Sequence, residues 1–210
     1  MGAPRKFRIA AAAAAAAMIA VPAVPAFAGP LQSSWRDDAS DFDINRLQQM
    51  DQWRERAVWE AQHYADGTGD FGALRAALEP QGHAVPARAL VGNWRCRNMK
   101  MGGVNAYIVY QWFNCRITSA NGGLFFQKLN GTLRTQGFLY PENGAWVYLG
   151  AASAKGEPPH RYSGRTPSVG APATPDDQIG LLSGIGDNRL RLEIPGPVEE
   201  SSYDIIELAR

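Results

Sequence analysis

The side chains that most often do chemistry are few in this sequence, and their spacing argues against a metal or catalytic motif. His63, His83 and His160 lie far apart, and no two of them have the spacing of metal ligands. The carboxylates at 176–177 and 199–200 are adjacent, which is the wrong spacing for two acids that act from opposite sides of one substrate. We therefore predict no metal, no cofactor and no catalytic residue. A hydrolase whose base is placed by the fold alone stays an alternative.

Aromatic side chains offer a second kind of chemistry, the binding of apolar ligands. The dense set comprises Trp94, Tyr107, Tyr110, Trp112, Phe113, Phe125, Phe126, Tyr140, Trp146 and Tyr148. Such side chains either fill the core of a small barrel or line an apolar pocket ringed by tyrosine hydroxyl groups. Both interpretations stay open. In the second, the expected binding residues include Trp94, Tyr110, Trp112 and Tyr148.

Cys96 and Cys115 are the two cysteines of the chain. A metal site would need further Cys or His ligands at close spacing, whereas an even pair in an oxidising compartment forms a disulfide. We expect a structural disulfide between them, with two free thiols as the alternative.

The N-terminus predicts an exported protein. Three basic residues precede an apolar stretch over residues 9–20, and Ala26-Phe27-Ala28 is typical of a signal peptidase site. Residues 1–28 are therefore expected to be a signal peptide, cleaved between Ala28 and Gly29. The apolar stretch is short for a membrane span, so a retained anchor is only the alternative. We expect a periplasmic or secreted protein without a stable membrane anchor.

Cleavage would leave a chain close to neutrality. Residues 1–28 hold three of the 21 basic residues and none of the 20 acidic residues, so the formal charge changes from +1 to −2. This balance offers no general attraction for nucleic acid, and we expect no nucleic-acid partner. The remaining length fits one domain.

Helical periodicity precedes the strands. A polar segment over residues 29–42 leads to a helical segment over residues 43–89. Apolar residues recur at intervals of three and four from Ile44 to Tyr64, which predicts a helix after an N-cap at Asp43. A shorter helix is predicted over residues 71–78.

From Leu90 onward the apolar period becomes two and turn residues multiply, which predicts strands. The eight expected strands are 91–101, 106–117, 124–130, 132–140, 145–152, 178–185, 189–194 and 202–208. Short connections imply antiparallel neighbours, and eight such strands close into a small barrel. We predict a mainly β (α+β) fold: an eight-stranded antiparallel β-barrel over residues 90–210, preceded by two N-terminal helices. If Cys96 and Cys115 face each other on the first two strands, the disulfide joins that hairpin and Trp94 plugs the barrel end.

The connection over residues 153–177 is long and rich in proline and glycine. Such a segment is either a functional loop or a disordered insertion. It concentrates the polar and aromatic side chains of His160, Arg161 and Tyr162. If it gates a ligand at the barrel rim, we expect Tyr162 to close over the ligand and His160 and Arg161 to meet a polar head group.

From about residue 47 to 210 the sequence resembles DUF4893, an exported family named as a domain of unknown function. The motifs that carry the resemblance are Asn93-Trp94-Arg95-Cys96-Arg97, Tyr110-Gln111-Trp112-Phe113-Asn114-Cys115-Arg116, Phe126-Gln127-Lys128-Leu129-Asn130-Gly131 and Gly137-Phe138-Leu139-Tyr140-Pro141. The resemblance implies the domain boundaries and the pairing of the two cysteines. It implies no activity.

A second resemblance is to the calycins. Gly92-Asn93-Trp94, at the start of the first expected strand, is similar to the Gly-x-Trp of the lipocalins, which makes the expected barrel calycin-like. The periplasmic metalloprotease inhibitors share this feature together with an early disulfide hairpin. The two N-terminal helices depart from both families.

The sequence leaves three functions open. We favour a non-enzymatic binding module for an apolar small molecule or lipid. The alternatives are an envelope protein that binds or inhibits a partner protein, and an uncharacterised hydrolase.

Processing of the N-terminus can be measured directly. The mass of the intact exported protein should correspond to a chain that begins at Gly29, because the peptidase pattern ends at Ala28. A species that keeps Met1 and fractionates with the membrane contradicts this expectation.

Overall fold

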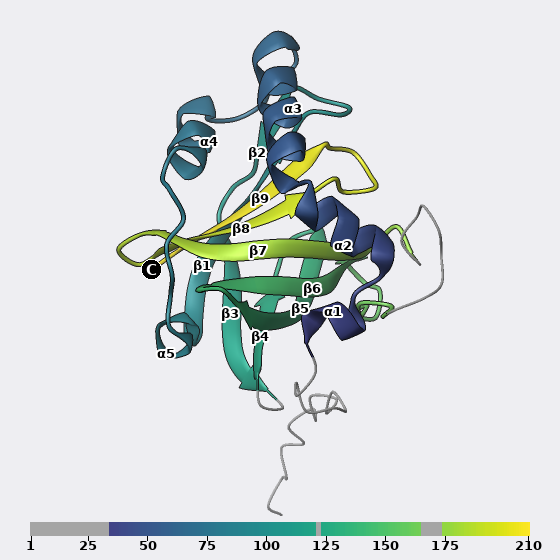
Figure 1. The fold of residues 1–210 in the computed structure, drawn as a ribbon. Coiled ribbons are helices and arrows are strands. Elements are labelled where there is room, and N and C mark those ends of the chain that lie inside the picture. Colours follow the sequence, from purple (N-terminus) through teal and green to yellow (C-terminus); the bar gives the residue numbers. More distant parts are fainter. Residues whose placement is uncertain (1–33, 121–122, 165–173) are drawn as a thin grey trace, which may run out of the picture.

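The computed structural model describes residues 34–120, 123–164 and 174–210, and it shows a mainly β protein (Figure 1). The described strands are β1 (Gly92–Met101), β2 (Tyr107–Val109), β3 (Phe113–Ala120), β4 (Gly123–Lys128), β5 (Leu133–Glu142), β6 (Ala145–Ala154), β7 (Asp177–Gly186), β8 (Arg189–Pro195) and β9 (Tyr203–Ala209). They form one antiparallel sheet in the order β2-β1-β3-β4-β5-β6-β7-β8-β9, and pairing of β1 with β9 closes it. The fold is a closed eight-stranded barrel with β2 as an extra strand.

β1 closes the barrel and has different partners along its length. Its residues 92–96 pair with β3, and residues 95–101 pair with β9. Its last three residues, 99–101, also pair with β2. The sequence predicted one strand over residues 106–117, whereas the chain divides there into β2 and β3. The division falls at residues 110–112, opposite the place where β1 changes partner from β3 to β2, and the Tyr110 N–H donates there to the Asn98 carbonyl at 3.0 Å.

The described helices are α1 (Trp35–Asp38), α2 (Asp41–Gln48), α3 (Met50–His63), α4 (Phe71–Leu78) and α5 (Ala87–Leu90). The helix expected after Asp43 begins earlier, because Ser40 is the N-cap and its Oγ accepts from the Asp43 N–H at 3.2 Å. The helical run is interrupted at Gln49, so the single expected helix is two. α1 lies within the polar segment expected over residues 29–42.

The larger helices cover one side of the barrel. α2 packs against β7, and α3 packs against β1, β8 and β9 (Figure 1). Arg46 attaches α2 to the barrel, because it donates to the carbonyl oxygens of Asp177 at 2.8 Å and Gly196 at 3.0 Å. Asp43 of the same helix forms a buried ion pair with Arg46 at 2.6 Å. None of the described helices is long and apolar enough to cross a membrane. The expected signal peptide and its cleavage site lie outside the described residues.

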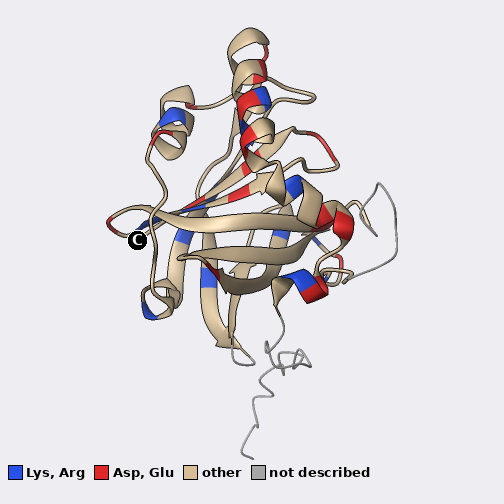
Figure 2. Ribbon diagram, in the orientation of Figure 1, with Lys and Arg blue, Asp and Glu red and all other residues tan. Residues whose placement is uncertain are grey.

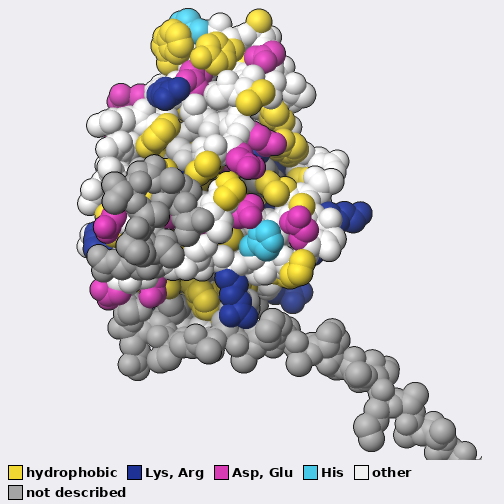
Figure 3. All heavy atoms as spheres, turned by 90° about the vertical axis from the view of Figure 1, so that its right-hand side faces the viewer, with side chains coloured by type: hydrophobic (Ala, Val, Ile, Leu, Met, Phe, Trp, Pro, Cys, Tyr) yellow, Lys and Arg dark blue, Asp and Glu magenta, His cyan; other side chains and the backbone are white. Residues whose placement is uncertain are grey.

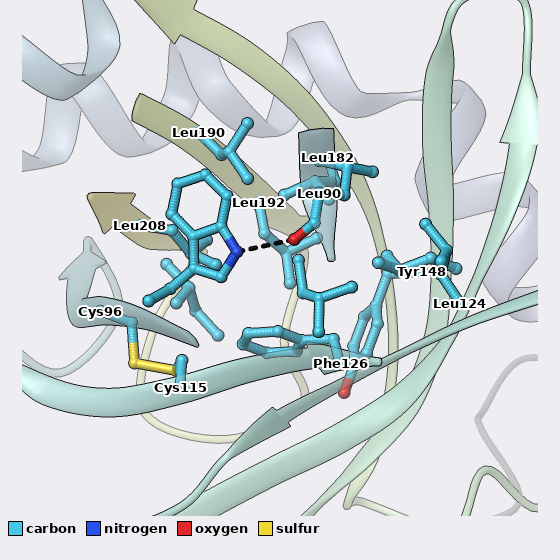
Figure 4. Close-up of a cluster of buried hydrophobic side chains, with 14 of the residues drawn as sticks. Leu90, Cys96, Cys115, Leu124, Phe126, Tyr148, Leu182, Leu190, Leu192 and Leu208 are labelled. Carbon is cyan, nitrogen blue, oxygen red and sulfur yellow. Dashed lines mark hydrogen bonds between the residues drawn. A yellow bond between two sulfur atoms is a disulfide. The ribbon is translucent and has the colours of Figure 1, made fainter. Parts of the chain in front are cut away.

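The middle of the barrel is filled by apolar side chains (Figure 4). Phe126, Tyr148 and Leu192 are almost completely buried there. The Tyr148 ring occupies space that glycine leaves, since a Cβ atom added to Gly150 would lie 2.1 Å from the Tyr148 hydroxyl oxygen. Of the two interpretations of the aromatic residues, the filled core therefore describes this part of the barrel.

One end of the barrel is plugged by Trp94. Its Nε1 donates to the carbonyl of Leu90, the last residue of α5, at 2.8 Å (dashed in Figure 4). Cys96 and Cys115 form a disulfide between β1 and β3, with their Cα atoms 5.8 Å apart. The expected disulfide and the expected plug thus occur together on the inner face of adjacent strands.

Loss of the disulfide should lower the melting temperature. A bridge that closes a loop of this length stabilises by about 3 kcal/mol, which corresponds to a loss of about 6–12 °C for a domain of this size. Differential scanning calorimetry of the protein with and without a thiol reductant tests this. The same reductant should leave a Cys96→Ala/Cys115→Ala variant unaffected, and equal melting of the oxidised and reduced wild-type protein contradicts the expectation.

Candidate functional site

The two ends of the barrel differ in the side chains that face its interior. The end closed by Trp94 and Leu90 is apolar. At the other end, where β1, β4 and β8 finish, the strand alternation directs polar side chains inward. Lys100 on β1, Lys128 on β4 and Asp204 on β9 share the inward face with core residues two or four positions away. We call this the polar end of the barrel.

Lys128 is the least compensated charge at the polar end. Its side chain is 6% exposed, its Nζ donates to the Leu133 carbonyl at 2.7 Å, and it lies 4.1 Å from the centre of the Phe113 ring. Among the described residues, no carboxylate lies within ion-pair distance of this ammonium group. Burial and the positive charge of Lys100 lower the pKa of Lys128 to about 8.

Lys100 is buried at the same end but has acid partners. Its Nζ lies 2.8 Å from Glu200 and 3.8 Å from Asp204. Burial acts to lower the pKa of Lys100, but Asp204 and Glu200 outweigh it and hold the pKa above its ordinary value. Burial in turn raises the pKa of Asp204, against the effect of Lys100. Lys100 is therefore an ion-paired residue, and the charge that lacks a partner belongs to Lys128.

Gly131 separates Lys128 from the surface. A Cβ atom added to Gly131 would lie 3.3 Å from the Lys128 Nζ and 3.0 Å from the Phe113 ring, so a larger residue would be tightly packed against both. The φ of Gly131 is +102°, a value that also favours glycine. Because Gly131 and Phe113 both line a surface groove, the ammonium group lies immediately behind the wall of that groove.

The groove lies between the β2–β3 connection and the β4–β5 turn and has a volume of about 780 Å³. Two of its apolar residues are unusually exposed, Tyr110 at 37% and Leu129 at 41%. Arg134 and Lys155 add positive charge to the lining. The groove thus combines an exposed apolar surface with cations, which suits an amphipathic ligand with an acidic group. Over the described part of the chain, no cluster of His, Cys, Asp and Glu could hold a metal ion.

The four aromatic residues predicted to bind a ligand lie in different places. Tyr110 lines the groove. Tyr148 is buried in the barrel interior, with its hydroxyl 2.8 Å from Thr135 Oγ1, and Trp94 plugs the opposite end. Trp112 lies outside the barrel against arginine side chains. The structure therefore does not bring these four residues into one pocket.

His160, Arg161 and Tyr162 do lie together, but on the outer face of β4–β6 rather than over the barrel mouth. They line a pocket of about 280 Å³ that also includes Phe125 and Phe138. The Tyr162 hydroxyl donates to Asp43 and accepts from the Ser40 N–H, so it anchors the loop to α2. Residues 165–173 of the long loop lie outside the described residues.

The sequence interpretation missed the two inward-facing lysines. The signal was present, because Lys128 follows the core residue Phe126 by two positions and therefore shares its face of β4. Lysine is rarely buried, so an inward lysine in a strand indicates a special environment. The sequence could not show that Lys128 lacks an acid partner, because this depends on how the strands are placed around the barrel.

Comparison with known proteins identifies a family whose description names no activity. A family model described as "Domain of unknown function (DUF4893)" matches residues 35–208. No curated protein and no solved structure matches the chain. The candidate site therefore has to be interpreted from its own side chains.

Replacement of Lys128 by an apolar residue of similar length should stabilise the fold. The pKa of Lys128 is about 8 in the folded protein and about 10.4 in an unfolded chain. Between these values the unfolded chain binds more protons, so the stability contributed by this group increases with pH and is lowest below pH 8. We expect Lys128→Met to raise the free energy of unfolding by about 3 kcal/mol at pH 7.

Urea unfolding of the wild-type and Lys128→Met proteins between pH 7 and pH 10 measures this difference. The advantage of the variant should shrink as the pH rises. A variant that is less stable than the wild-type protein at pH 7, or an advantage that is constant with pH, contradicts the unpaired buried charge.

Proposed function

The chain belongs to the DUF4893 family, whose description assigns no activity, and we propose that it is an exported, non-enzymatic module that binds an amphipathic anion at the polar end of the barrel. The ligand class is an apolar chain or ring system that carries one carboxylate or phosphate group. The apolar part lies in the groove beside Tyr110 and Leu129, and the acidic group pairs with Lys128.

The observation that carries the proposal is the unpaired ammonium group of Lys128. A buried charge without a partner lowers the stability of the folded protein. The ammonium group of Lys128 is such a charge, and it lies directly behind the Phe113 and Gly131 wall of an apolar groove. Sites that bind ligands commonly depart from the arrangement that is best for stability. A bound anion would supply the missing partner and recover the desolvation cost of Lys128.

The groove, rather than the barrel interior, is the place for the apolar part of the ligand. Phe126, Tyr148 and Leu192 occupy the space in which a hollow barrel would hold a ligand. The acidic group of the ligand needs to reach only the ammonium group of Lys128. The Phe113 side chain and the turn at Gly131 lie in front of that group, so they are the parts that must move when the ligand binds. Export is part of the same proposal, and the Cys96–Cys115 disulfide is compatible with an oxidising compartment.

Dodecanoate and dodecan-1-ol form a matched pair of probes, because they share an alkyl chain and differ in charge. At pH 7 we expect isothermal titration calorimetry to show dodecanoate binding at least about tenfold more tightly, since its carboxylate meets a charged donor. Between about pH 6 and pH 8, where dodecanoate is ionised and Lys128 keeps its proton, the affinity should be constant. Above pH 8 it should fall by about tenfold per pH unit, as Lys128 loses its proton.

Two variants identify the residue responsible. Lys128→Met should abolish both the preference for the acid and the pH break near 8. Lys155→Met removes a cation from the exposed rim of the same groove and should weaken binding while the break stays near pH 8. Equal affinity for the acid and the alcohol, or an unchanged pH profile in Lys128→Met, would refute the proposal.

A further inference from the structure

The outer face of β3 and of the first half of β1 is basic and exposed. α3 covers only the later part of β1, where Met99 and Met101 pack with Ala57 and Ala61. The exposed side chains of Asn93 and Arg95 on β1 and of Asn114 and Arg116 on β3 point away from the barrel core. Figure 2 shows basic positions along these two strands. Figure 3 shows another side of the molecule, where acidic side chains lie among the basic ones. We call the outer surface formed by residues 93, 95, 114 and 116 the arginine face.

The arginines of this face differ from their neighbours in having no acid partner. Arg97 and Arg189 both bind Glu207, at 2.7 and 2.6 Å. For Arg95 and Arg116, by contrast, no carboxylate of the described chain lies within ion-pair distance. Arg guanidinium groups keep their charge at any physiological pH, so the face has a permanent local excess of positive charge.

Contacts with uncharged groups hold these guanidinium groups in position. The Trp112 ring contacts the guanidinium group of Arg95, 4.8 Å from its centre, and also that of the ion-paired Arg97, at 4.5 Å. Arg116 Nε donates to Asn93 Oδ1 across the strand pair at 3.0 Å. Side chains that are already ordered lose less entropy when they bind an anion, so this arrangement favours binding.

Exposed apolar residues border the arginine face at both ends of the strands. Val91 is 40% exposed immediately before β1. At the other end, Tyr110 and Leu129 are exposed at the groove, and Tyr110 precedes Trp112 by two residues. A basic surface with an apolar border matches the interface of a bilayer, where phosphate groups lie next to hydrocarbon.

We propose that the arginine face docks the protein on an anionic phospholipid bilayer. The apolar border, together with the positive charge, favours a lipid surface over two other anionic partners. An extended acidic peptide has no free strand edge to join here, because β1 and β3 pair with each other and with β9 and β4 on either side. A nucleic acid offers phosphate groups but no hydrocarbon layer to meet the exposed side chains of Val91, Tyr110 and Leu129. The docking surface is tested separately from the groove ligand, so either proposal can fail alone.

Vesicle binding tests the docking surface directly. The purified protein and its variants, all in the same processed form, are sedimented with phosphatidylcholine vesicles that contain either no phosphatidylglycerol or about 30% of it. We expect binding only to the anionic vesicles, and loss of binding as salt screens the surface. Arg95→Gln/Arg116→Gln should lower the partition coefficient by about 30-fold, which is about fivefold per arginine.

Arg36→Gln/Arg75→Gln is the matched control. It removes the same net charge from exposed arginines on α1 and α4 that pair with Glu142 and Glu79. This control should bind within about twofold of the wild-type protein, because paired surface charges contribute little. Three results overturn the proposal: an equal loss in the control, equal binding to neutral vesicles, or equally tight binding of a short single-stranded oligonucleotide that competes with the vesicles.

Discussion

Closure of the sheet by the pairing of β1 with β9 is the constraint on which the rest of this structure depends. A closed barrel of eight strands has no free edge around its wall, and its interior is just wide enough for side chains to fill. The disulfide between Cys96 and Cys115 joins β1 to its neighbour β3, and Trp94 blocks the end beside it. Tyr148 fits in the middle only because Gly150 leaves room for its ring. The barrel wall is therefore a rigid scaffold, and any ligand has to be accommodated at an end or on the outside.

Closure of the barrel also determines which polar side chains are buried, and burial of a charged side chain lowers the stability of the fold. Once β1 and β4 are in register, their alternation directs Lys100 and Lys128 inward at the polar end, whatever partners are available. Lys100 finds Asp204 and Glu200, and this pairing raises its pKa despite burial. Lys128 finds only a carbonyl oxygen and an aromatic ring, and its pKa falls. Two lysines on one inner surface thus have opposite electrostatic environments. The difference between them is the physical basis for assigning a ligand to one and a structural role to the other.

Much of the fold could be predicted from the sequence, because alternation and turn residues are local signals. The barrel and the antiparallel order follow from them and are confirmed. The disulfide, predicted from the pair of cysteines, is also present. The extra strand β2 could not be predicted, because the division at Tyr110 depends on where β1 changes partners. The inward position of Lys128 was readable from its spacing to Phe126, but its lack of an acid partner was not. The expectation that Tyr162 closes over a ligand came from the composition of the long loop and stays a prediction. What the sequence could not show is that the Tyr162 hydroxyl reaches Asp43 on α2, a contact between residues far apart in the chain.

The short segment between β2 and β3 connects the two proposed surfaces. Tyr110 lines the groove, Trp112 contacts the guanidinium groups of Arg95 and Arg97 outside the barrel, and Phe113 turns inward over Lys128. One stretch of backbone therefore contributes side chains to both the groove and the arginine face. A movement of this segment that gives an anion access to Lys128 would also displace the ring that holds Arg95 and Arg97. Occupancy of the groove and attachment of the arginine face are therefore expected to be coupled through Trp112 and Phe113, and by linkage each would change the other by the same factor.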